Sequence, residues 1–344
     1  MEQISKRFQQ SPFWVGFKCA HGWSSVMKDG VAVLCRTFPL GPLRLSVAYI
    51  PLAPELRDGE SLEDFVGRIS AFASGVRPLL PGGTLLARFD LPLDFGGAAE
   101  RDAARGRIRA AARAGRVPLK KARVDVQPPD SVLLDLSKTE DELLSSMRAK
   151  WRYNIRYAAK RGVLVRAVSR ESGRLDGELA SFYRLYRATA ERDGIGIHPL
   201  AYYRDLLLRS EAGAKVTLYI ASHEGNDLAA IITLFTGDEA VYLYGCSGNE
   251  KRNLMPAYLA QWTAIRDAKA FGSKVYDFYG IPPTGDEKHP MHGLYLFKTG
   301  FGGTEVHRPG SFDVPFSPLH RLYALAEAAR AWYHKKLMKR IRGR

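Results

Sequence analysis

The stretch VTLYIASHEGNDLAAIITLFTGDEAVYLYGC, residues 216–246, decides the fold. Three apolar runs rich in β-branched and aromatic residues, at 216–222, 228–235 and 240–246, predict three strands. The connections EGND and TGDE between them are so short that each strand must pair with the next in antiparallel fashion. The sequence therefore predicts a three-stranded meander in the second half of the chain.

The order of elements after this meander is repeated near the N-terminus. Residues 255–271 predict a helix that ends at Gly272, and residues 274–278 predict one further strand. The first half has the same order, with strands at 23–27, 31–38 and 43–50, a helix at 62–76 and a strand at 83–89. We therefore expect an α/β (α+β) fold of two similar domains, each a mixed, mainly antiparallel sheet flanked by helices. This order resembles the acyltransferases of the GNAT type.

The composition predicts a folded and strongly basic protein. Of the 344 residues 46% are hydrophobic, which excludes disorder for most of the chain. The 51 Lys and Arg against 36 Asp and Glu give a net charge of +15, which favours polyanionic partners such as RNA, diphosphates or an anionic membrane surface. The three cysteines have no disulfide or zinc spacing, and the N-terminus has no apolar signal-peptide core. We therefore expect a cytoplasmic protein.

The segment 137–161 predicts a long helix with a cationic face. Ser137 and Glu140 predict a capping box at its start, and Gly162 predicts its end. Four cations recur at intervals of four residues, with tyrosines between them: Arg148, Arg152, Arg156 and Lys160. Since no carboxylate neutralises this stripe, we expect it to bind an anion; a solvated helix face is the alternative.

Several common catalytic signatures are missing. GCSGN at 245–249 lacks the last glycine of a nucleophile elbow, and there is no Walker loop or dinucleotide-binding glycine pattern. The loop NEKRNLMP at 249–256 lacks the glycines with which GNAT acyltransferases hold coenzyme A. GDEKHPMH at 285–292 has no strong metal-ligand spacing. We therefore expect no cofactor and no metal.

Segments along nearly the whole chain together resemble the FemABX family of peptidoglycan bridge-forming aminoacyltransferases. The two specific segments are 137–163 and 242–303, the second of which ends in GLYLFKTGFGG. The others are FQQSPFWVGFKCAHGW at 8–23, YIPLAP at 49–54, RFDLP at 88–92 and ERDGI at 191–195.

The resemblance implies transfer of an amino acid from aminoacyl-tRNA to an amine of a UDP-linked or lipid-linked peptidoglycan precursor. It implies two GNAT-like domains, which we place at 1–135 plus 310–344 for precursor binding and at 136–309 for the catalytic lysine and the tRNA side. The chain has no coiled-coil insertion and is similar to the compact members of the family. We therefore expect tRNA to bind the cationic stripe Arg148, Arg152, Arg156 and Lys160.

The resemblance also assigns roles to single residues. Lys298 of FKTGFGG is implied to be catalytic, and Asp90 of RFDLP is a candidate base. A surface lysine and a turn aspartate are the alternatives. The residues implied to bind substrate are Lys18, Arg192, Tyr244, Phe297 and Gly300.

The C-terminus predicts a docked helix followed by a basic tail. Leu322, Leu325, Ala329 and Trp332 form an apolar stripe, which we expect to dock on the protein body. Residues 335–344 hold six cations around three apolar side chains, a pattern that favours contact with the inner face of the membrane. A tail that repels other chains is the alternative.

Two other functions stay open at the level of sequence. One is a GNAT-type N-acyltransferase that uses acyl-CoA or acyl carrier protein on a surface polysaccharide or another amine. The other is a non-enzymatic RNA-binding protein, which predicts no role for Lys298.

Overall fold

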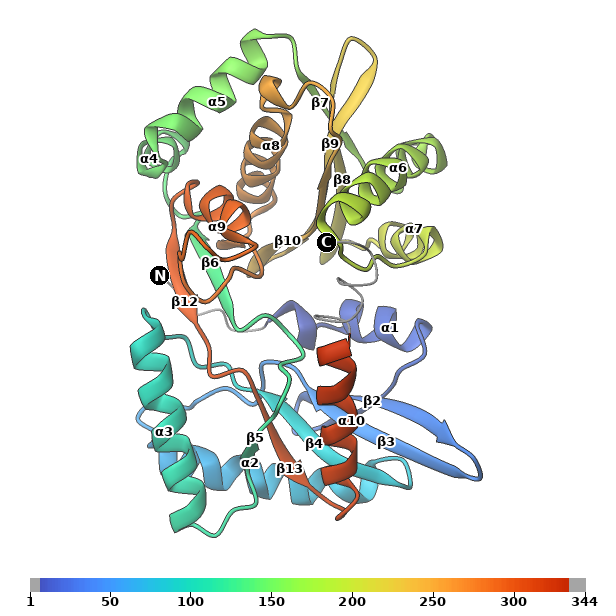
Figure 1. Cartoon of the computed structure of the whole chain (residues 1–344), viewed down its shortest axis with the longest axis vertical. Helices are drawn as coiled ribbons and strands as arrows, with labels where there is room; N and C mark the ends of the chain where they lie inside the picture. The colour runs from blue at the N-terminus through green and yellow to red at the C-terminus, as the bar shows by residue number, and fades with distance from the viewer. Residues whose placement is uncertain (1–6, 334–344) are drawn as a thin grey trace. The chain divides into compact units, whose positions relative to one another are not determined.

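The computed structural model describes residues 7–333, which form two compact units (Figure 1). The central unit holds residues 7–8 and Ser131–Glu305. The terminal unit holds Gln9–Asp130 and residues 306–333. It is therefore built from segments that come before and after most of the central unit in the sequence. The basic tail 335–344 lies outside the described residues. Within residues 7–333, no helix has the length and apolar character needed to cross a bilayer.

The terminal unit is a six-stranded mixed sheet in the order β1-β2-β3-β4-β13-β5. Asp29 and Gly30 both have positive φ, which permits the tight turn between the first two strands. The strands are β1 (Ser24–Lys28), β2 (Val31–Leu40), β3 (Leu43–Ile50), β4 (Thr84–Asp90), β5 (Lys120–Lys121) and β13 (Ser311–Pro315). The helices are η1 (Phe8–Gln10, which begins in the central unit), α1 (Pro12–Ala20), α2 (Leu62–Val76), η2 (Arg77–Leu79), α3 (Ala98–Ala114) and α10 (His320–Trp332).

The central unit is a seven-stranded mixed sheet in the order β12-β6-β11-β10-β9-β8-β7. Its strands are β6 (Asp130–Asp135), β7 (Leu164–Val168), β8 (Ala214–His223), β9 (Asn226–Thr236), β10 (Glu239–Ser247), β11 (Val275–Asp277) and β12 (Thr304–His307). Its helices are α4 (Glu140–Ser146), α5 (Ala149–Lys160), α6 (Leu175–Asp193), α7 (Leu200–Leu208), η3 (Arg252–Leu254), α8 (Pro256–Phe271) and α9 (His292–Thr299).

The two units repeat one arrangement. In each, an antiparallel meander is followed by a helix that carries the chain to a parallel strand: α2 joins β3 to β4, and α8 joins β10 to β11. The predicted fold class, two mixed and mainly antiparallel sheets flanked by helices, is confirmed.

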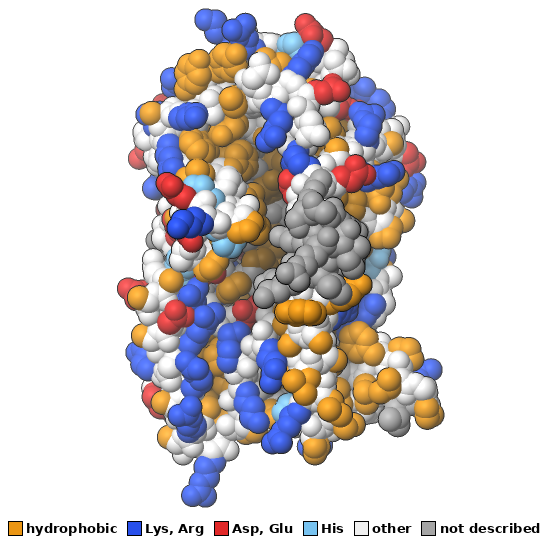
Figure 2. Space-filling model, viewed as in Figure 1, with side chains coloured by type: hydrophobic (Ala, Val, Ile, Leu, Met, Phe, Trp, Pro, Cys, Tyr) orange, Lys and Arg blue, Asp and Glu red, His pale blue; other side chains and the backbone are white. Residues whose placement is uncertain are grey.

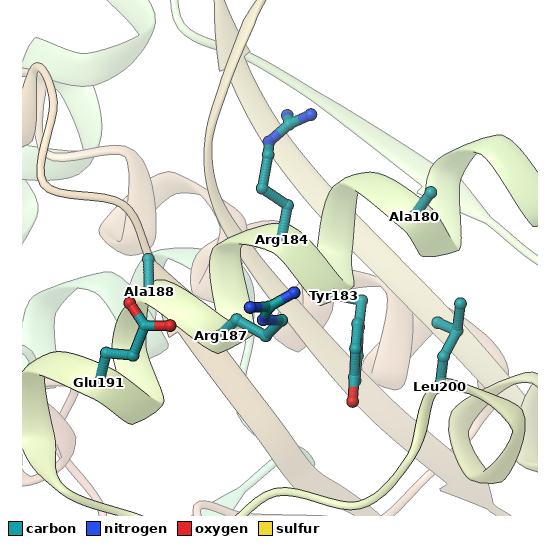
Figure 3. A pocket seen from close by; sticks show the side chains of 7 residues that line it. All are labelled: Ala180, Tyr183, Arg184, Arg187, Ala188, Glu191 and Leu200. Carbon is teal, nitrogen blue, oxygen red and sulfur yellow. The ribbon is translucent and has the colours of Figure 1, made fainter.

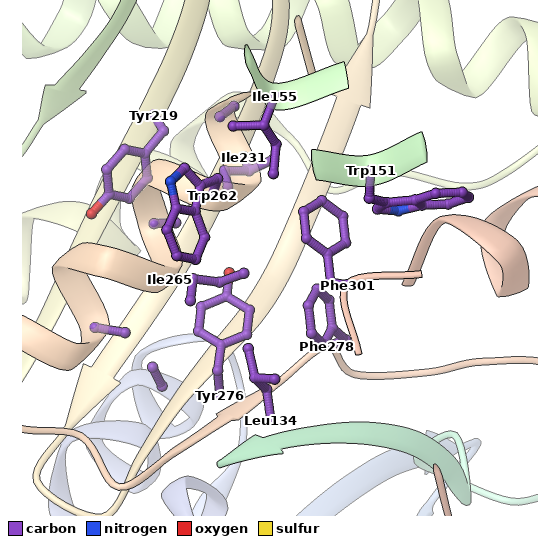
Figure 4. Close-up of a cluster of buried hydrophobic side chains, with 14 of the residues drawn as sticks. Leu134, Trp151, Ile155, Tyr219, Ile231, Trp262, Ile265, Tyr276, Phe278 and Phe301 are labelled. Atoms are coloured by element: carbon purple, nitrogen blue, oxygen red, sulfur yellow. The ribbon is translucent and has the colours of Figure 1, made fainter. Parts of the chain in front are cut away.

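Aromatic side chains dominate the core of the central unit. Trp151 and Ile155 of α5 and Trp262 and Ile265 of α8 pack with residues of the sheet, among them Tyr276 (Figure 4). Such large side chains contribute most of the apolar burial in a core. α8 contacts α5 on one side and strands β8 and β9 on the other, so it lies between α5 and the sheet (Figure 1).

The predicted single helix at 137–161 is wrong. Met147 is extended, so the segment forms α4 and α5, and the capping box pairs Thr139 with Glu142 instead of Ser137 with Glu140. Ser137 donates to Asp135 instead. Gly162 has a φ of +80°, which confirms the predicted end.

The predicted docking of the C-terminal apolar stripe is also wrong. Leu322, Leu325, Ala329 and Trp332 are all exposed on α10. The helix instead docks through Glu327, which lies 2.6 Å from the Arg88 guanidinium.

Candidate active site

Lys298 lies near the end of α9 with a buried side chain that is 5% exposed. Its Nζ donates to the backbone carbonyl oxygen of Tyr279, and to that of Gly280 at 2.8 Å. An ammonium group carries three N–H donors, so these two carbonyls leave one donor for a ligand, as far as the described residues go.

Burial controls the ionisation of Lys298. Removal from water lowers its pKa from 10.5 to about 7, and the Asp277 carboxylate acts in the opposite direction. The ring of Tyr242 has its centroid 5.2 Å from Nζ, and an aromatic face stabilises a cation. Lys298 therefore changes between ammonium and amine near neutral pH, as suits a group that stabilises charge or moves a proton.

A turn after β11 presents the two carbonyl groups that hold Lys298. Tyr279 and Gly280 both have positive φ, a conformation that is uncommon for a tyrosine. Buried Asp277 accepts hydrogen bonds from the Ser131 hydroxyl and, at 2.7 Å, from the backbone N–H of Tyr279. Asp277 is therefore a positioning residue: it braces the turn and raises the pKa of the ammonium group that the turn binds.

A β-bulge in β10 sends two tyrosines to opposite faces of the sheet. Tyr242 pairs with Thr233 of β9 and Tyr244 pairs with Ile232, so the strand holds one extra residue between them. Thr233 and Ile232 are consecutive in β9, so their side chains point to opposite faces of the sheet. Each tyrosine side chain points to the same face as that of the residue with which it pairs. Tyr242 consequently lies beside Lys298, whereas Tyr244 faces α6 and α7.

Tyr244 and Arg192 lie together on the α6 side of β10. The Tyr244 ring is 5.1 Å from the Tyr203 ring, in a cluster of aromatic side chains from α6 and α7. Arg192 donates to the carbonyl oxygen of Ser247 at 3.0 Å and to Asn249 at 3.2 Å. It also pairs with Asp193 at 2.9 Å, so a substrate phosphate would have to compete with that carboxylate.

Phe297 and Gly300 fix α9 against α5. The carbonyl oxygen of Phe297 accepts a hydrogen bond from Trp151 Nε1 at 2.9 Å. A Cβ on Gly300 would lie 2.1 Å from the Trp151 ring, and its carbonyl accepts from the Arg148 N–H at 3.0 Å. Packing accounts for both residues, and their contact with substrate stays a prediction.

In the terminal unit, Lys18 of α1 forms a cationic site with Arg36 of β2. Lys18 Nζ lies 5.8 Å from the Trp14 ring centroid and 5.2 Å from that of Trp23. Arg36 stacks on the same Trp23 at 5.8 Å and donates to the carbonyl of Gly22 at 2.7 Å. Burial, and then the charge of Arg36, lowers the pKa of Lys18. Within residues 7–333 neither cation has a carboxylate partner, so the pair suits an anionic ligand.

Asp90 is a buried carboxylate at the end of β4. It accepts hydrogen bonds from the hydroxyls of Tyr49 and Ser311, which lie on the two neighbouring strands. Burial raises its pKa to about 6, and these two hydrogen bonds act in the opposite direction. The arrangement ties β3, β4 and β13 together. A role as general base stays a prediction, and the burial of both oxygens does not support it.

The four cations of the predicted stripe lie in two different environments. Arg152 donates to the carbonyl oxygens of Met147 and, at 3.2 Å, Ser145, so it caps the end of α4. The other three cations are exposed on or beside α5, and we call them the α5 cationic face: Arg148, Arg156 and Lys160. On the same helix the rings of Tyr153 and Tyr157 stack on each other, with their centroids 5.6 Å apart.

A pocket of about 400 Å³ lies on the face of α6 that is opposite to its buried side chains (Figure 3). Its lining comes from α6 and the start of α7: Ala180, Tyr183, Arg184, Arg187, Ala188, Glu191 and Leu200. Within residues 7–333, no three His, Cys, Asp or Glu side chains form a group that could hold a metal. The candidate site residues thus form two separate groups, the Lys298 environment in the central unit and the Lys18–Arg36 pair in the terminal unit.

Three contributors were missed from the sequence: Tyr242, Asp277 and Arg36. Tyr242 lies in the stretch 216–246 that predicts the meander, but a bulge cannot be read from a strand pattern. Asp277 is an acidic residue at the end of the short strand VYD, between apolar residues of the sequence, and an acid in such a position indicates a functional or paired carboxylate.

Comparison with known proteins identifies the family of this chain and solved structures with a similar fold. Residues 118–223 and 213–330 match the FemAB family. A lipid II:glycine glycyltransferase of Staphylococcus aureus (strain USA300) is 25% identical over 264 residues, which cover 57% of this chain and 61% of that relative. The match thus spans about three-fifths of the relative's length.

Two solved structures share the fold over most of both chains. The crystal structure of FemX has a TM-score of 0.72 at 20% identity and covers 92% of this chain and 94% of its own. The C-terminal domain of a putative lysylphosphatidylglycerol synthetase from Agrobacterium fabrum has a TM-score of 0.56 at 13% identity, with coverages of 93% and 92%.

Proposed function

Because the chain belongs to the FemAB family, as its sequence predicted, we propose that it transfers an amino acid from aminoacyl-tRNA to an amine of a peptidoglycan precursor. The observation that carries the proposal is Lys298, a buried lysine with a pKa near 7 and an N–H donor left for a ligand. The similar protein of Staphylococcus aureus is named for glycine transfer to lipid II, which supports such a precursor as acceptor.

The chemistry needs a cation and no cofactor. An aminoacyl ester is already activated, so the acceptor amine attacks its carbonyl carbon directly. The carbonyl oxygen becomes an oxyanion, the amine loses a proton, and the ribose oxygen of the tRNA takes up a proton as the ester bond breaks. The Lys298 ammonium, held by the carbonyls of Tyr279 and Gly280, would stabilise the oxyanion with its third donor.

We assign precursor binding to the terminal unit and tRNA binding to the central unit. UDP-linked and lipid-linked precursors both carry a diphosphate, and Lys18 and Arg36 offer two cations without carboxylate partners among residues 7–333. Two residues of the central unit, Arg192 and Tyr244, are assigned to the precursor as well, through the match of their motifs, so that unit would contribute to precursor binding in addition to tRNA binding. We place the reaction in the cytoplasm, where charged tRNA is made.

A donor test separates this proposal from its two rivals. The protein is incubated with a precursor and with either tRNA charged with labelled amino acids or labelled acetyl-CoA. We expect label in the precursor only with charged tRNA, and none after ribonuclease treatment. Transfer from acetyl-CoA would support the N-acyltransferase instead. Binding of tRNA without transfer to any precursor would support an RNA-binding protein.

Asp277→Asn is expected to move the alkaline limb of the kcat/KM profile to lower pH. Asp277 raises the pKa of Lys298, so removing its charge lowers that pKa further and depletes the ammonium form at neutral pH. The asparagine oxygen can still accept from Ser131 and Tyr279, which preserves the turn. Asp286→Asn, in an exposed loop, is the control. A limb that stays in place or moves to higher pH would contradict the role of Asp277.

Neutralising the α5 cationic face is expected to flatten the salt dependence of tRNA binding. The combined variant Arg148→Gln, Arg156→Gln and Lys160→Gln should lower the slope of log K against log salt by about 2–3, since each phosphate contact contributes roughly 0.7–0.9. Arg152→Gln is the matched control, because Arg152 is already engaged by backbone carbonyls. Equal slopes for wild type and the triple variant would show that these cations do not contact tRNA and belong to a solvated helix face.

A further inference from the structure

α10 presents a row of large apolar side chains to solvent. Leu319, Leu322, Leu325 and Trp332 are 44%, 63%, 50% and 55% exposed. Figure 2 shows hydrophobic side chains gathered along this helix in the lower half of the view. Single exposed leucines are ordinary, but a row along one helix face indicates an interaction surface.

A polar network fixes this orientation of the helix. Buried Arg88 of β4 binds both carboxylate oxygens of Asp313 on β13 and reaches Glu327 of α10 at 2.6 Å. The Arg88 guanidinium also lies 5.9 Å from the Tyr323 ring centroid. Turning the apolar row inward would break the ion pair between Glu327 and Arg88 and leave a buried N–H group of the guanidinium without its acceptor, which is costly. The exposure of the apolar row is therefore built into the fold.

The tip of the β2–β3 hairpin continues the apolar surface. Phe38 and Leu40 are exposed, and the Phe38 ring lies 6.4 Å from the Tyr323 ring of α10. Gly41 and Pro42 at the tip are exposed as well. Helix and hairpin thus offer one surface, which we call the α10 face: Phe38, Leu40, Leu319, Leu322, Leu325 and Trp332.

The charges beside the α10 face are positive. Arg321 and Arg330 are exposed on the same helix. From residue 314 to the last residue of the chain the only carboxylate side chain is Glu327, which points away from the apolar row to Arg88. A second copy of this basic chain would bring like charges together, whereas anionic lipid headgroups complement them.

We propose that the α10 face docks on an anionic lipid bilayer, with its apolar side chains in the interfacial region and Arg321 and Arg330 among the headgroups. Apolar burial and attraction to anionic lipid together give this kind of peripheral binding. The inference goes beyond the proposed function, because it needs neither tRNA nor precursor. It would place the protein at the surface where a lipid-linked acceptor is found.

Vesicle sedimentation tests the proposal on the full chain without any substrate. We expect wild type to bind vesicles of phosphatidylcholine and phosphatidylglycerol more tightly than vesicles of phosphatidylcholine alone. Leu322→Glu with Leu325→Glu should weaken binding by about tenfold or more. Leu164→Glu with Leu208→Glu, two exposed leucines of the central unit, should leave binding unchanged. Thermal unfolding should be alike in all three proteins, since these side chains are exposed.

Two further measurements separate the α10 face from other occupants and from the tail. Brominated lipid should quench tryptophan fluorescence of wild type more than that of Trp332→Phe. Deletion of 335–344 should weaken sedimentation without abolishing it. Unchanged binding by the double glutamate variant would overturn the proposal, as would complete loss on deleting the tail. A wild-type dimer that ignores vesicles, and that the double variant makes monomeric, would assign the face to a second copy.

Discussion

Lys298→Met is expected to lower kcat for amino-acid transfer by about 100–1,000-fold, the effect typical of removing one donor to an oxyanion. The methionine fills similar space but offers no N–H, so the developing charge would lose its cation. Binding of tRNA should change little, because the α5 cationic face is untouched. The measurement is single-turnover transfer with saturating precursor, which separates chemistry from binding.

Lys288→Met is the matched control for this prediction. Lys288 lies exposed in the loop before α9, so its loss changes the net charge equally without entering the site. Because Lys298→Met leaves the carbonyls of Tyr279 and Gly280 without their donor, thermal unfolding of the variant must be recorded as well. A folded Lys298→Met protein with turnover within a few-fold of wild type would remove Lys298 from the mechanism.

Lys18→Ala is expected to raise the KM for the precursor by roughly 10–100-fold, because hydrogen bonds to charged groups contribute about 1.5–3 kcal/mol. The effect on kcat should be much smaller, since a diphosphate contact is the same in the ground and transition states. Lys28→Ala is the control, because that lysine is already paired with Asp29 at 3.1 Å. An unchanged KM would show that Lys18 does not bind the precursor.

Local sequence signals predicted most of the fold. The meander at 216–246 has alternating apolar residues and turns with glycine at positive φ, such as Gly225, so both strands and connections could be read from the sequence. The helix at 62–76 begins and ends as predicted, because Ser61 caps it and its apolar residues share one face. Such elements depend on neighbours in sequence.

The wrong predictions depend on partners far away in the chain. The orientation of α10 is set by the contact between Glu327 and Arg88, which lies more than 200 residues earlier in the chain. The apolar row of α10 therefore predicted the wrong face of the helix as the buried one. The break at Met147 accompanies the bond from the Arg148 N–H to the carbonyl of Gly300. A helical pattern alone contains neither partner.

The sequence predicted the lysine of the candidate site, Lys298, but not the residues that surround it. Lys298 stands in a motif that resembles the family, so its position needed no structure. Its two carbonyl partners, the brace at Asp277 and the neighbouring Tyr242 depend on a turn with positive φ and on a β-bulge. A period-two strand pattern contains neither of these irregularities.

The mass of the precursor after incubation with bulk charged tRNA tests the central claim most directly. The account predicts a product heavier by one amino-acid residue, formed by wild type and by Lys288→Met, and absent with Lys298→Met or with uncharged tRNA. Fragmentation of the product should place the added residue on an amine of the stem peptide. A precursor whose mass is unchanged, although the protein is folded and binds both tRNA and precursor, would contradict the account.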